Sequence, residues 1–237
     1  MFKKEYLIET SDVDGLSELK LSSLFRYLQD AATEHAERLG VGQSKVLDNG
    51  MFWVITRYYL EITKMPSYFE KIIVYTYPGE GQKLVLPRLF KITDEKGNLL
   101  IKASSSWVIL NRNTHRIVID PFKDMALPFE KYEDDAILPP KVMPEEAVIV
   151  ESRKVRYSDV DLNTHLNNTK YIEYIMDTHD LDFYKKHRLK KVIINYNKEI
   201  LGGQVVNIKS NQQLKEYISG DVEGVNVFDA LLEFEEK

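Results

Sequence analysis

A short segment that occurs twice is the feature that most constrains the fold of this chain. The residues Ser11-Asp12-Val13-Asp14 return 147 positions later as Ser158-Asp159-Val160-Asp161. Residues 54–62 return 138 positions later as residues 192–200, with five of the nine positions identical. Two matches in the same order indicate that the chain contains two copies of one structural unit. Because the two offsets differ by nine, we expect one loop of the first copy to be nine residues longer.

Each copy is predicted to contain one main helix after the repeated segment. In the first copy, apolar residues recur at helical spacing between Leu21 and Leu39, with polar residues between them. Ser17 is a candidate N-cap, and Gly40 stands where a helix C-terminus often has glycine. A similar apolar stripe in the second copy starts near residues 167–168 and comprises Tyr171, Ile172, Ile175 and Met176.

Each predicted helix is preceded by one strand-like segment and followed by four. In the first copy these strands are predicted at residues 3–10, 52–63, 69–77, 84–93 and 99–110. In the second copy they are predicted at residues 149–157, 191–199, 204–210, 212–219 and 225–235. Turns are predicted at Lys96-Gly97-Asn98, Gly202-Gly203 and Ser219-Gly220.

The arrangement of these elements predicts an α+β fold. A helix with one apolar stripe must bury that stripe against another surface, and a curved antiparallel sheet wrapped round the helix provides it. Two such units side by side can pair their strand edges and form one continuous sheet. The predicted domains are residues 1–120 and 149–237, joined by an extended linker over residues 121–148 that contains five of the eight prolines.

The composition excludes several kinds of site. The chain has no cysteine, which rules out disulfide bonds, thiolate metal ligands and a cysteine nucleophile. No phosphate loop, dinucleotide fingerprint or zinc-binding helix occurs, so neither a cofactor nor a metal site is predicted. A net charge of -5 does not favour nucleic acid as a partner. Because no apolar run approaches the ~20 residues of a membrane span and the start shows no targeting signal, we expect a cytoplasmic protein without a membrane span.

Three polar residues before the second predicted helix form a candidate catalytic group. Asp161, Asn163 and His165 alternate along the chain, and an extended backbone would point them to the same side. Histidine suits a general base because its pKa lies near neutrality. Free backbone N–H groups at a helix start can stabilise an oxyanion. The group fits thioester hydrolysis, in which Asn163 orients the carbonyl or the water, and Asp161 or Glu199 orients the imidazole or activates the water.

The first copy lacks the central part of this group. At the repeat offset, Leu16 and Glu18 stand where the second copy has the asparagine and the histidine. The aspartate and the glutamate are retained as Asp14 and Glu61. We therefore predict one working site in the second copy and a degenerate site in the first, which is then free to hold substrate.

Each of these residues also has a structural interpretation. Asparagines such as Asn163 favour turns and caps for backbone reasons. The two retained aspartates could both cap local structure, and Glu61 and Glu199 could lie on solvated strand faces. A lone histidine such as His165 is more often a surface residue than a base. The remaining histidines are interpreted as structural: His35, His115, His179 and His187.

Residues 185–191 concentrate five lysines and arginines in an acidic protein. The preferred interpretation is a solvated helix end, where cations are favourable. The alternative is a docking patch for an acidic partner, through electrostatic complementarity.

The run from Asp161 to Ile172, followed by Asn197-Lys198-Glu199, resembles the acyl-(acyl carrier protein) thioesterases of plants and bacteria. The resemblance covers nearly the whole chain, including the two-copy layout and the proline-bearing linker. It implies a tandem hotdog fold, with the acyl chain held largely by the first copy and the chemistry in the second. It also implies hydrolysis of acyl-[acyl carrier protein] to free fatty acid. The family's catalytic residues would fall on Asp161, Asn163, His165 and Glu199.

The resemblance also bears on the nucleophile. Plant members have a cysteine after the glutamate, where this chain has Ile200, so attack by water is expected. Which of Asp161, His165 and Glu199 accepts the proton stays open. The plant transit peptide is missing, which favours a bacterial-type enzyme of the cytoplasm.

Three other functions remain possible at this stage. They are hydrolysis of acyl-coenzyme A, hydration or dehydration of an acyl thioester, and lipid binding without turnover. The duplication supplies an internal pseudo-dimer, so either a monomer or a homodimer is compatible with the sequence.

Overall fold

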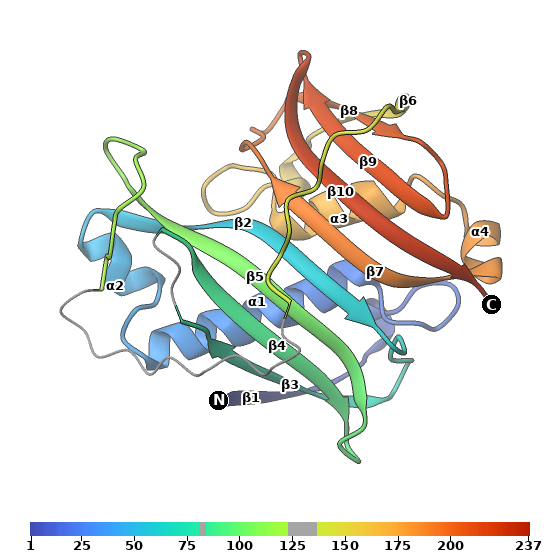
Figure 1. Cartoon of the computed structure of the whole chain (residues 1–237), viewed down its shortest axis with the longest axis horizontal. Helices are drawn as coiled ribbons and strands as arrows, with labels where there is room; N and C mark the ends of the chain where they lie inside the picture. Colours follow the sequence, from blue (N-terminus) through green and yellow to red (C-terminus); the bar gives the residue numbers. More distant parts are fainter. Residues whose placement is uncertain (81–83, 123–136) are drawn as a thin grey trace.

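The computed structural model describes residues 1–80, 84–122 and 137–237, and these form one ten-stranded antiparallel sheet with helices on its concave side (Figure 1). The strands follow the order β1-β3-β4-β5-β2-β7-β10-β9-β8-β6. The first half contains β1 (Phe2–Leu7), α1 (Leu21–Arg38), α2 (Gln43–Asp48), β2 (Met51–Ile62), β3 (Lys71–Pro78), β4 (Leu86–Asp94) and β5 (Leu99–Asn111). The second half contains β6 (Val148–Lys154), α3 (Asn168–Met176), α4 (Leu181–Lys186), β7 (His187–Tyr196), β8 (Val205–Ser210), β9 (Lys215–Val222) and β10 (Val225–Glu236).

The two halves meet where β2 pairs with β7. The ladder runs from Arg57↔Asn195 to Glu61↔Lys191. At the repeat offset of 138, Asn195 is the counterpart of Arg57, so these two residues lie opposite each other at a pseudo-twofold axis. The strands that the sequence identifies as copies therefore pair with one another, and the predicted double hotdog with one continuous sheet is confirmed.

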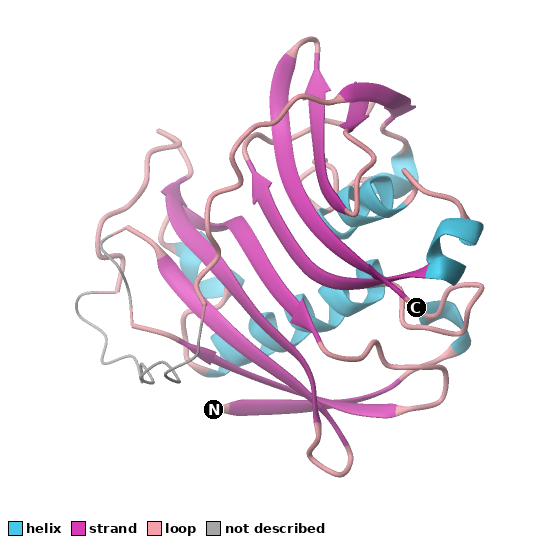
Figure 2. Ribbon diagram, turned by 45° about the vertical axis from the view of Figure 1, so that its right-hand side comes forward, coloured by secondary structure: helices cyan, strands magenta, loops and turns pink. Residues whose placement is uncertain are grey.

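Each half buries its main helix in the curve of its own part of the sheet (Figure 2). Leu24, Leu28 and Ala31 recur on one face of α1 and are fully buried, as the helical spacing predicts. Ile172 and Ile175 occupy the same position on α3. All five belong to one hydrophobic core that continues from the first half into the second.

The nine-residue difference between the halves lies in a helix, so the expectation of a longer loop is wrong. Helix α1 has 18 residues and α3 has nine, whereas α2 and α4 both have six. Gly40, with φ of 73°, follows the end of α1 as predicted. The extra length adds two and a half turns to the C-terminal part of α1.

Two local predictions need correction. Ser17 is not the N-cap of α1, because the helix begins at Leu21 and Ser17 lies in a tight loop with φ of 62°. Ser219 and Gly220 lie inside β9, and the turn to β10 is made by Glu223-Gly224, both with positive φ. Gly220 is required in the strand because an added Cβ would lie 2.2 Å from a carbon of the buried Phe228 ring.

The repeated Ser-Asp-Val-Asp segment forms the same loop in both halves. Residues Thr10–Asp12 and Tyr157–Asp159 are short 3-10 helices at equivalent positions. In the first half, the hydroxyl of Tyr27 donates to Asp12 at 2.7 Å. In the second half, Tyr174 donates to Asp159 at 3.2 Å. The bond from tyrosine to aspartate therefore fastens each loop to its helix.

Residues 137–147 cross the outer face of the sheet near the junction of the halves (Figure 1). The hydroxyl of Ser104 donates to the carbonyl of Ile137 at 2.5 Å, and the amide of Asn195 donates to that of Val142 at 3.4 Å. Val142 is buried against Tyr59, which lies on β2. The part of the predicted linker over residues 123–136 lies outside the described residues. Among the helices that the structure describes, none is long and apolar enough to cross a membrane.

We predict that Tyr27→Phe destabilises the protein by about 1–3 kcal/mol and that Tyr174→Phe has a smaller effect. The bond from Tyr27 is the shorter one, and its acceptor Asp12 is buried, whereas Asp159 is half-buried. Urea unfolding of both variants measures the difference. Equal effects, or a larger effect of Tyr174→Phe, would contradict the assignment.

Candidate active site

His165 and Glu199 come together although 33 residues separate them in the sequence. His165 Nε2 lies 3.4 Å from Glu199 Oε2, with 28% of the His165 side chain and 49% of the Glu199 side chain exposed. The backbone holds this distance, since the N–H of Leu166 donates to the carbonyl of Ile200 at 2.7 Å. The loop before α3 and the segment after β7 are therefore joined next to the pair.

Asp161 organises the loop that carries Asn163 and His165. Its Oδ1 accepts hydrogen bonds from the backbone N–H of Asn163 at 2.8 Å and of His165 at 3.1 Å. Asp14 makes the same two bonds in the first half, at the same two distances. The aspartate retained in both copies thus has the structural role that its retention suggested.

The start of α3 offers a backbone donor to the same site. Asn167 is the N-cap and its side chain accepts from the N–H of Thr169. The N–H of Lys170 donates to the carbonyl of Asn167. The N–H of Asn168 has no acceptor among the described residues, and Asn168 lines the pocket beside exposed Asn163. A negatively charged oxygen could bind here, near the positive end of the helix dipole.

Two tyrosines, the buried Tyr171 and the half-buried Tyr196, form the wall next to this pair. Burial, and then the nearby Glu199 carboxylate, raise the pKa of Tyr171 above its ordinary value. Burial likewise raises the pKa of Tyr196. Both phenols therefore stay protonated near neutral pH, and neither can serve as a general base.

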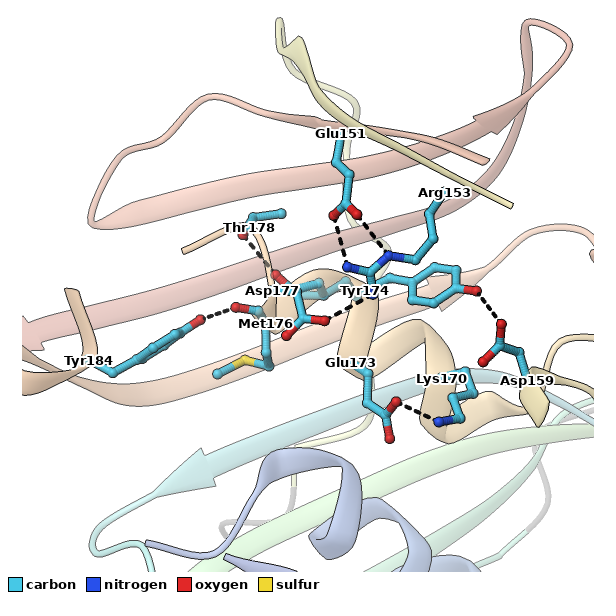
Figure 3. A network of polar contacts seen from close by, with 11 residues as sticks. Glu151, Arg153, Asp159, Lys170, Glu173, Tyr174, Met176, Asp177, Thr178 and Tyr184 are labelled. Atoms are coloured by element: carbon cyan, nitrogen blue, oxygen red, sulfur yellow. Dashed lines mark hydrogen bonds and ion pairs between the residues drawn. The ribbon is translucent and has the colours of Figure 1, made fainter. Parts of the chain in front are cut away.

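A polar network connects α3 with β6 and with the loop before the helix (Figure 3). The guanidinium of Arg153 donates to Glu151 and to Asp177 at the end of α3, and it lies over the ring of Tyr174. Tyr174 in turn donates to Asp159. The C-terminal end of α3 is thus joined both to β6 and to the loop before the helix.

A pocket of about 1530 Å³ opens at the candidate site and extends into the first half. Asn163, His165 and Glu199 line it on the second-half side. On the first-half side, its lining includes Ala32, Thr33, Ala36, Leu39, Val54 and Trp107. The α1 residues in this set belong to the two and a half turns that α3 lacks, so the longer helix forms one wall of the pocket.

Arg88, for which no role was predicted from the sequence, makes one region of this wall polar. It is 8% exposed and bonds His35 Nδ1 at 3.1 Å and Thr76 Oγ1 at 3.3 Å. Burial lowers its pKa to about 10, so it remains a cation at neutral pH. A basic residue inside the otherwise apolar run of residues 84–90 was the sequence signal for this position.

The other histidines have local partners, with one qualification. His179 contacts the buried Glu216 at 2.7 Å, and His187 contacts the carbonyl of Phe183 at 3.0 Å. His115 is exposed and lines the pocket, so its interpretation as structural is incomplete. Within the described residues, no group of three or more acidic or histidine side chains is arranged to hold a metal ion.

The equivalent residues of the first half do not converge. Glu18 lies 3.4 Å from Lys237, whereas Glu61 accepts a hydrogen bond from Tyr59. An added Cβ on Gly15 would lie 3.5 Å from Leu181, so α4 packs where the second half has its open mouth. The polar centre is therefore present on one side of the pseudo-twofold axis.

The fold and the site together define a double-hotdog protein with a polar centre at the mouth of a large, mainly apolar pocket. The family model of the acyl-ACP thioesterase N-terminal domain matches residues 1–121, and that of the C-terminal domain matches residues 143–227. The chain belongs to the acyl-ACP thioesterase family.

Known proteins of this kind are similar over most of the chain. A palmitoyl-acyl carrier protein thioesterase of Arabidopsis thaliana is 25% identical, covering 84% of this chain and 52% of the relative. The chain spans about half the length of the first curated relatives that it matches. An acyl-ACP thioesterase structure from Bacteroides thetaiotaomicron has a TM-score of 0.90 at 24% identity, covering 98% of this chain and 97% of the other. The 12:0-ACP thioesterase of Umbellularia californica has a TM-score of 0.86 at 20% identity, covering 100% and 97%.

We predict that Asp161→Ala destabilises the protein by about 1 kcal/mol, because two backbone N–H groups lose their acceptor. Asp161→Asn keeps an acceptor oxygen and should unfold at nearly the urea concentration of the wild type. Asp14→Ala provides the matched control, with an effect like that of Asp161→Ala. A stability loss in Asp161→Asn equal to that of Asp161→Ala would refute the loop-organising role.

Proposed function

We propose that this protein hydrolyses fatty acyl-[acyl carrier protein] to free fatty acid and the carrier protein with its free thiol. The observation that carries the proposal is the His165–Glu199 pair at the mouth of a pocket long enough to extend into the other half. Family membership supports the reaction class, and the named relatives are thioesterases of acyl carrier protein.

The site supports attack by water without a covalent intermediate. The chain has no cysteine, so it lacks the thiol that plant members of the family have after the glutamate. A water oxygen bonds to the thioester carbonyl carbon while its proton passes to the His165–Glu199 pair. The C–S bond then breaks, and the leaving thiolate takes that proton. The products are the acid and the thiol, with atoms and charge balanced.

The other polar groups have supporting roles in this proposal. The amide of Asn163 and the free N–H of Asn168 can stabilise the oxygen of the tetrahedral intermediate. Glu199 can hold the imidazole of His165 in one tautomer or take the proton directly. Asp161 keeps the loop in shape, since its Oδ1 already accepts two backbone hydrogen bonds.

The first half is proposed to hold the acyl chain and the second to carry the chemistry. Much of the apolar pocket wall comes from α1, β2 and β5, whereas the candidate catalytic groups come from the loop before α3 and from residue 199. Burial of apolar chain surface there contributes binding free energy of about 0.8 kcal/mol per methylene. The cytoplasmic location and the monomeric or homodimeric state stay predictions.

The sequence does not decide whether the acyl group is carried by acyl carrier protein or by coenzyme A, and the two acyl donors can be compared directly. The same acyl group is supplied on acyl carrier protein and on coenzyme A, and free acid is measured. A higher kcat/KM with the carrier protein is expected. An enoyl thioester tested for water addition separates hydrolysis from hydration, and retained acyl thioester without product would indicate a binding protein.

We predict that His165→Ala and Glu199→Gln each lower kcat by about 10²–10⁴-fold, because each removes one member of the proton-accepting pair. Release of free fatty acid from acyl-[acyl carrier protein] is the measurement, with circular dichroism as the check on folding. The matched controls are Glu18→Ala and Glu61→Gln, which change the equivalent positions of the first half. Wild-type turnover in folded His165→Ala would remove the basis of the catalytic assignment.

We predict that Ala36→Leu lowers turnover of long acyl chains more than that of short ones. Ala36 lines the pocket on the additional turns of α1, and a larger side chain there reduces the space available. Competition between a short and a long acyl thioester gives the ratio of the two kcat/KM values. An unchanged ratio would mean that the chain does not lie along this part of α1.

A further inference from the structure

The cations of residues 185–191 are poorly suited to docking an acidic partner at this site. Lys185 pairs with Asp182, Lys191 pairs with Glu233, and Arg188 and Lys190 share Glu235. These carboxylates already neutralise most of the positive charge of the segment. The segment is also divided between the end of α4 and the start of β7, so its cations do not lie on one helix end.

Distance separates this segment from the site as well. Strand β7 has ten residues and spans roughly 30 Å between His187 and Tyr196, which lines the pocket. The prosthetic arm of a carrier protein has about as many backbone bonds as five residues of extended chain, so it reaches roughly 17 Å. A carrier protein docked around residue 187 could not bring its thioester to the His165–Glu199 pair.

Two loops at the pocket mouth carry exposed cations that are close to the site and have no acidic partner among the described residues. Residues 112–119 of the first half carry Arg112 and Arg116 and no acidic residue. Residue Arg156 stands at the start of the second-half loop, and Lys198 precedes Glu199. All four cations are exposed, and none has an ion pair within the part of the chain that the structure describes.

The acidic residues of the second-half loop are turned toward the protein. Asp161 accepts from two backbone N–H groups, and Asp159 accepts from the N–H of Arg156 and the hydroxyl of Tyr174. Their charges are partly compensated by these donors, while the neighbouring guanidinium of Arg156 stays in solvent. The loop therefore presents a cation outward beside the mouth.

Exposed apolar side chains stand next to these cations on both sides. Leu162 and Tyr157 are the most exposed of the large apolar side chains that the structure describes, and both line the pocket. On the first-half side, Ile117 and Ile119 are exposed in the segment that follows Arg116. Apolar residues among unpaired cations are typical of a surface that binds an acidic protein partner.

We propose that an acidic carrier protein docks over this mouth surface, defined as Arg112, Arg116, Ile119, Arg156, Tyr157, Leu162 and Lys198. The proposal rests on the proposed function and replaces residues 185–191 as the docking surface. In this position the prosthetic arm of the carrier protein enters between the two loops. The thioester at its end then reaches His165 and Glu199 within the length of the arm.

Arg116→Glu combined with Arg156→Glu tests the docking surface, since neither residue lines the pocket. The double variant should have a kcat/KM for acyl-[acyl carrier protein] that is lower by about tenfold or more. This kcat/KM should also depend less on the salt concentration than that of the wild type. Hydrolysis of the same acyl group on N-acetylcysteamine, a small uncharged thiol, should be unchanged. Lys186→Glu is the matched control, because Lys186 is exposed, has no ion pair among the described residues and lies beyond the far end of β7.

The other outcomes overturn the proposal in distinguishable ways. An unchanged kcat/KM of the double variant with the carrier protein would show that the mouth surface is not the docking surface, and it would leave the proposed hydrolase function standing. An equal loss in Lys186→Glu restores residues 185–191 as the docking site. Failure of the wild type to hydrolyse either thioester refutes the proposed function and the docking surface with it. Loss of binding to anionic phosphatidylglycerol vesicles, with carrier-protein kinetics unchanged, identifies a membrane surface instead.

Discussion

The antiparallel ladder between β2 and β7 is the interaction on which the rest of the structure depends. It satisfies the backbone groups of two strands that would otherwise be exposed edges, and it joins two small sheets into one. Because the strands run in opposite directions, the end of β7 lies beside the middle of β2 at Arg57, and the start of β2 extends past it. Glu199 follows that end, and Val54 lies near that start, so the ladder brings the polar centre to the mouth of the first-half pocket.

Nine additional helical residues break the symmetry that the ladder creates. In the second half, α3 stops after nine residues, whereas α1 continues and contributes Ala32 and Ala36 to the pocket wall. Small side chains on this extension leave space between helix and sheet. On the opposite side of the axis, α4 packs against Gly15, where the second half opens to solvent. One half therefore gains a pocket and the other gains the polar residues at its mouth.

The polar residues found in both copies hold the loop in place, whereas those found only in the second copy line the pocket. Asp14 and Asp161 make the same pair of backbone hydrogen bonds, and Tyr27 and Tyr174 fasten the same loop to its helix. Each copy therefore holds its loop in place with the same two contacts. Asn163 and His165 have no equivalent in the first half, and they line the pocket in the second. Comparison of the two copies thus separates the residues that hold the loop from those available for chemistry.

The sequence by itself determined the duplication, the ten strands and the two main helices, because periodicity and internal identity record local geometry and ancestry. It proposed the polar group of the second half, and it did not predict the short helices α2 and α4. It also predicted that Gly40 ends the first helix, since a left-handed residue is needed there. Only the tertiary structure decided that the nine extra residues lengthen α1, that Asp161 serves the backbone, and that Glu199 meets His165. The same holds for the cations of the second half, since the pairing of Arg188 with Glu235 across β7 and β10 is a matter of strand register. Register depends on packing between residues far apart in the chain, which no local pattern encodes.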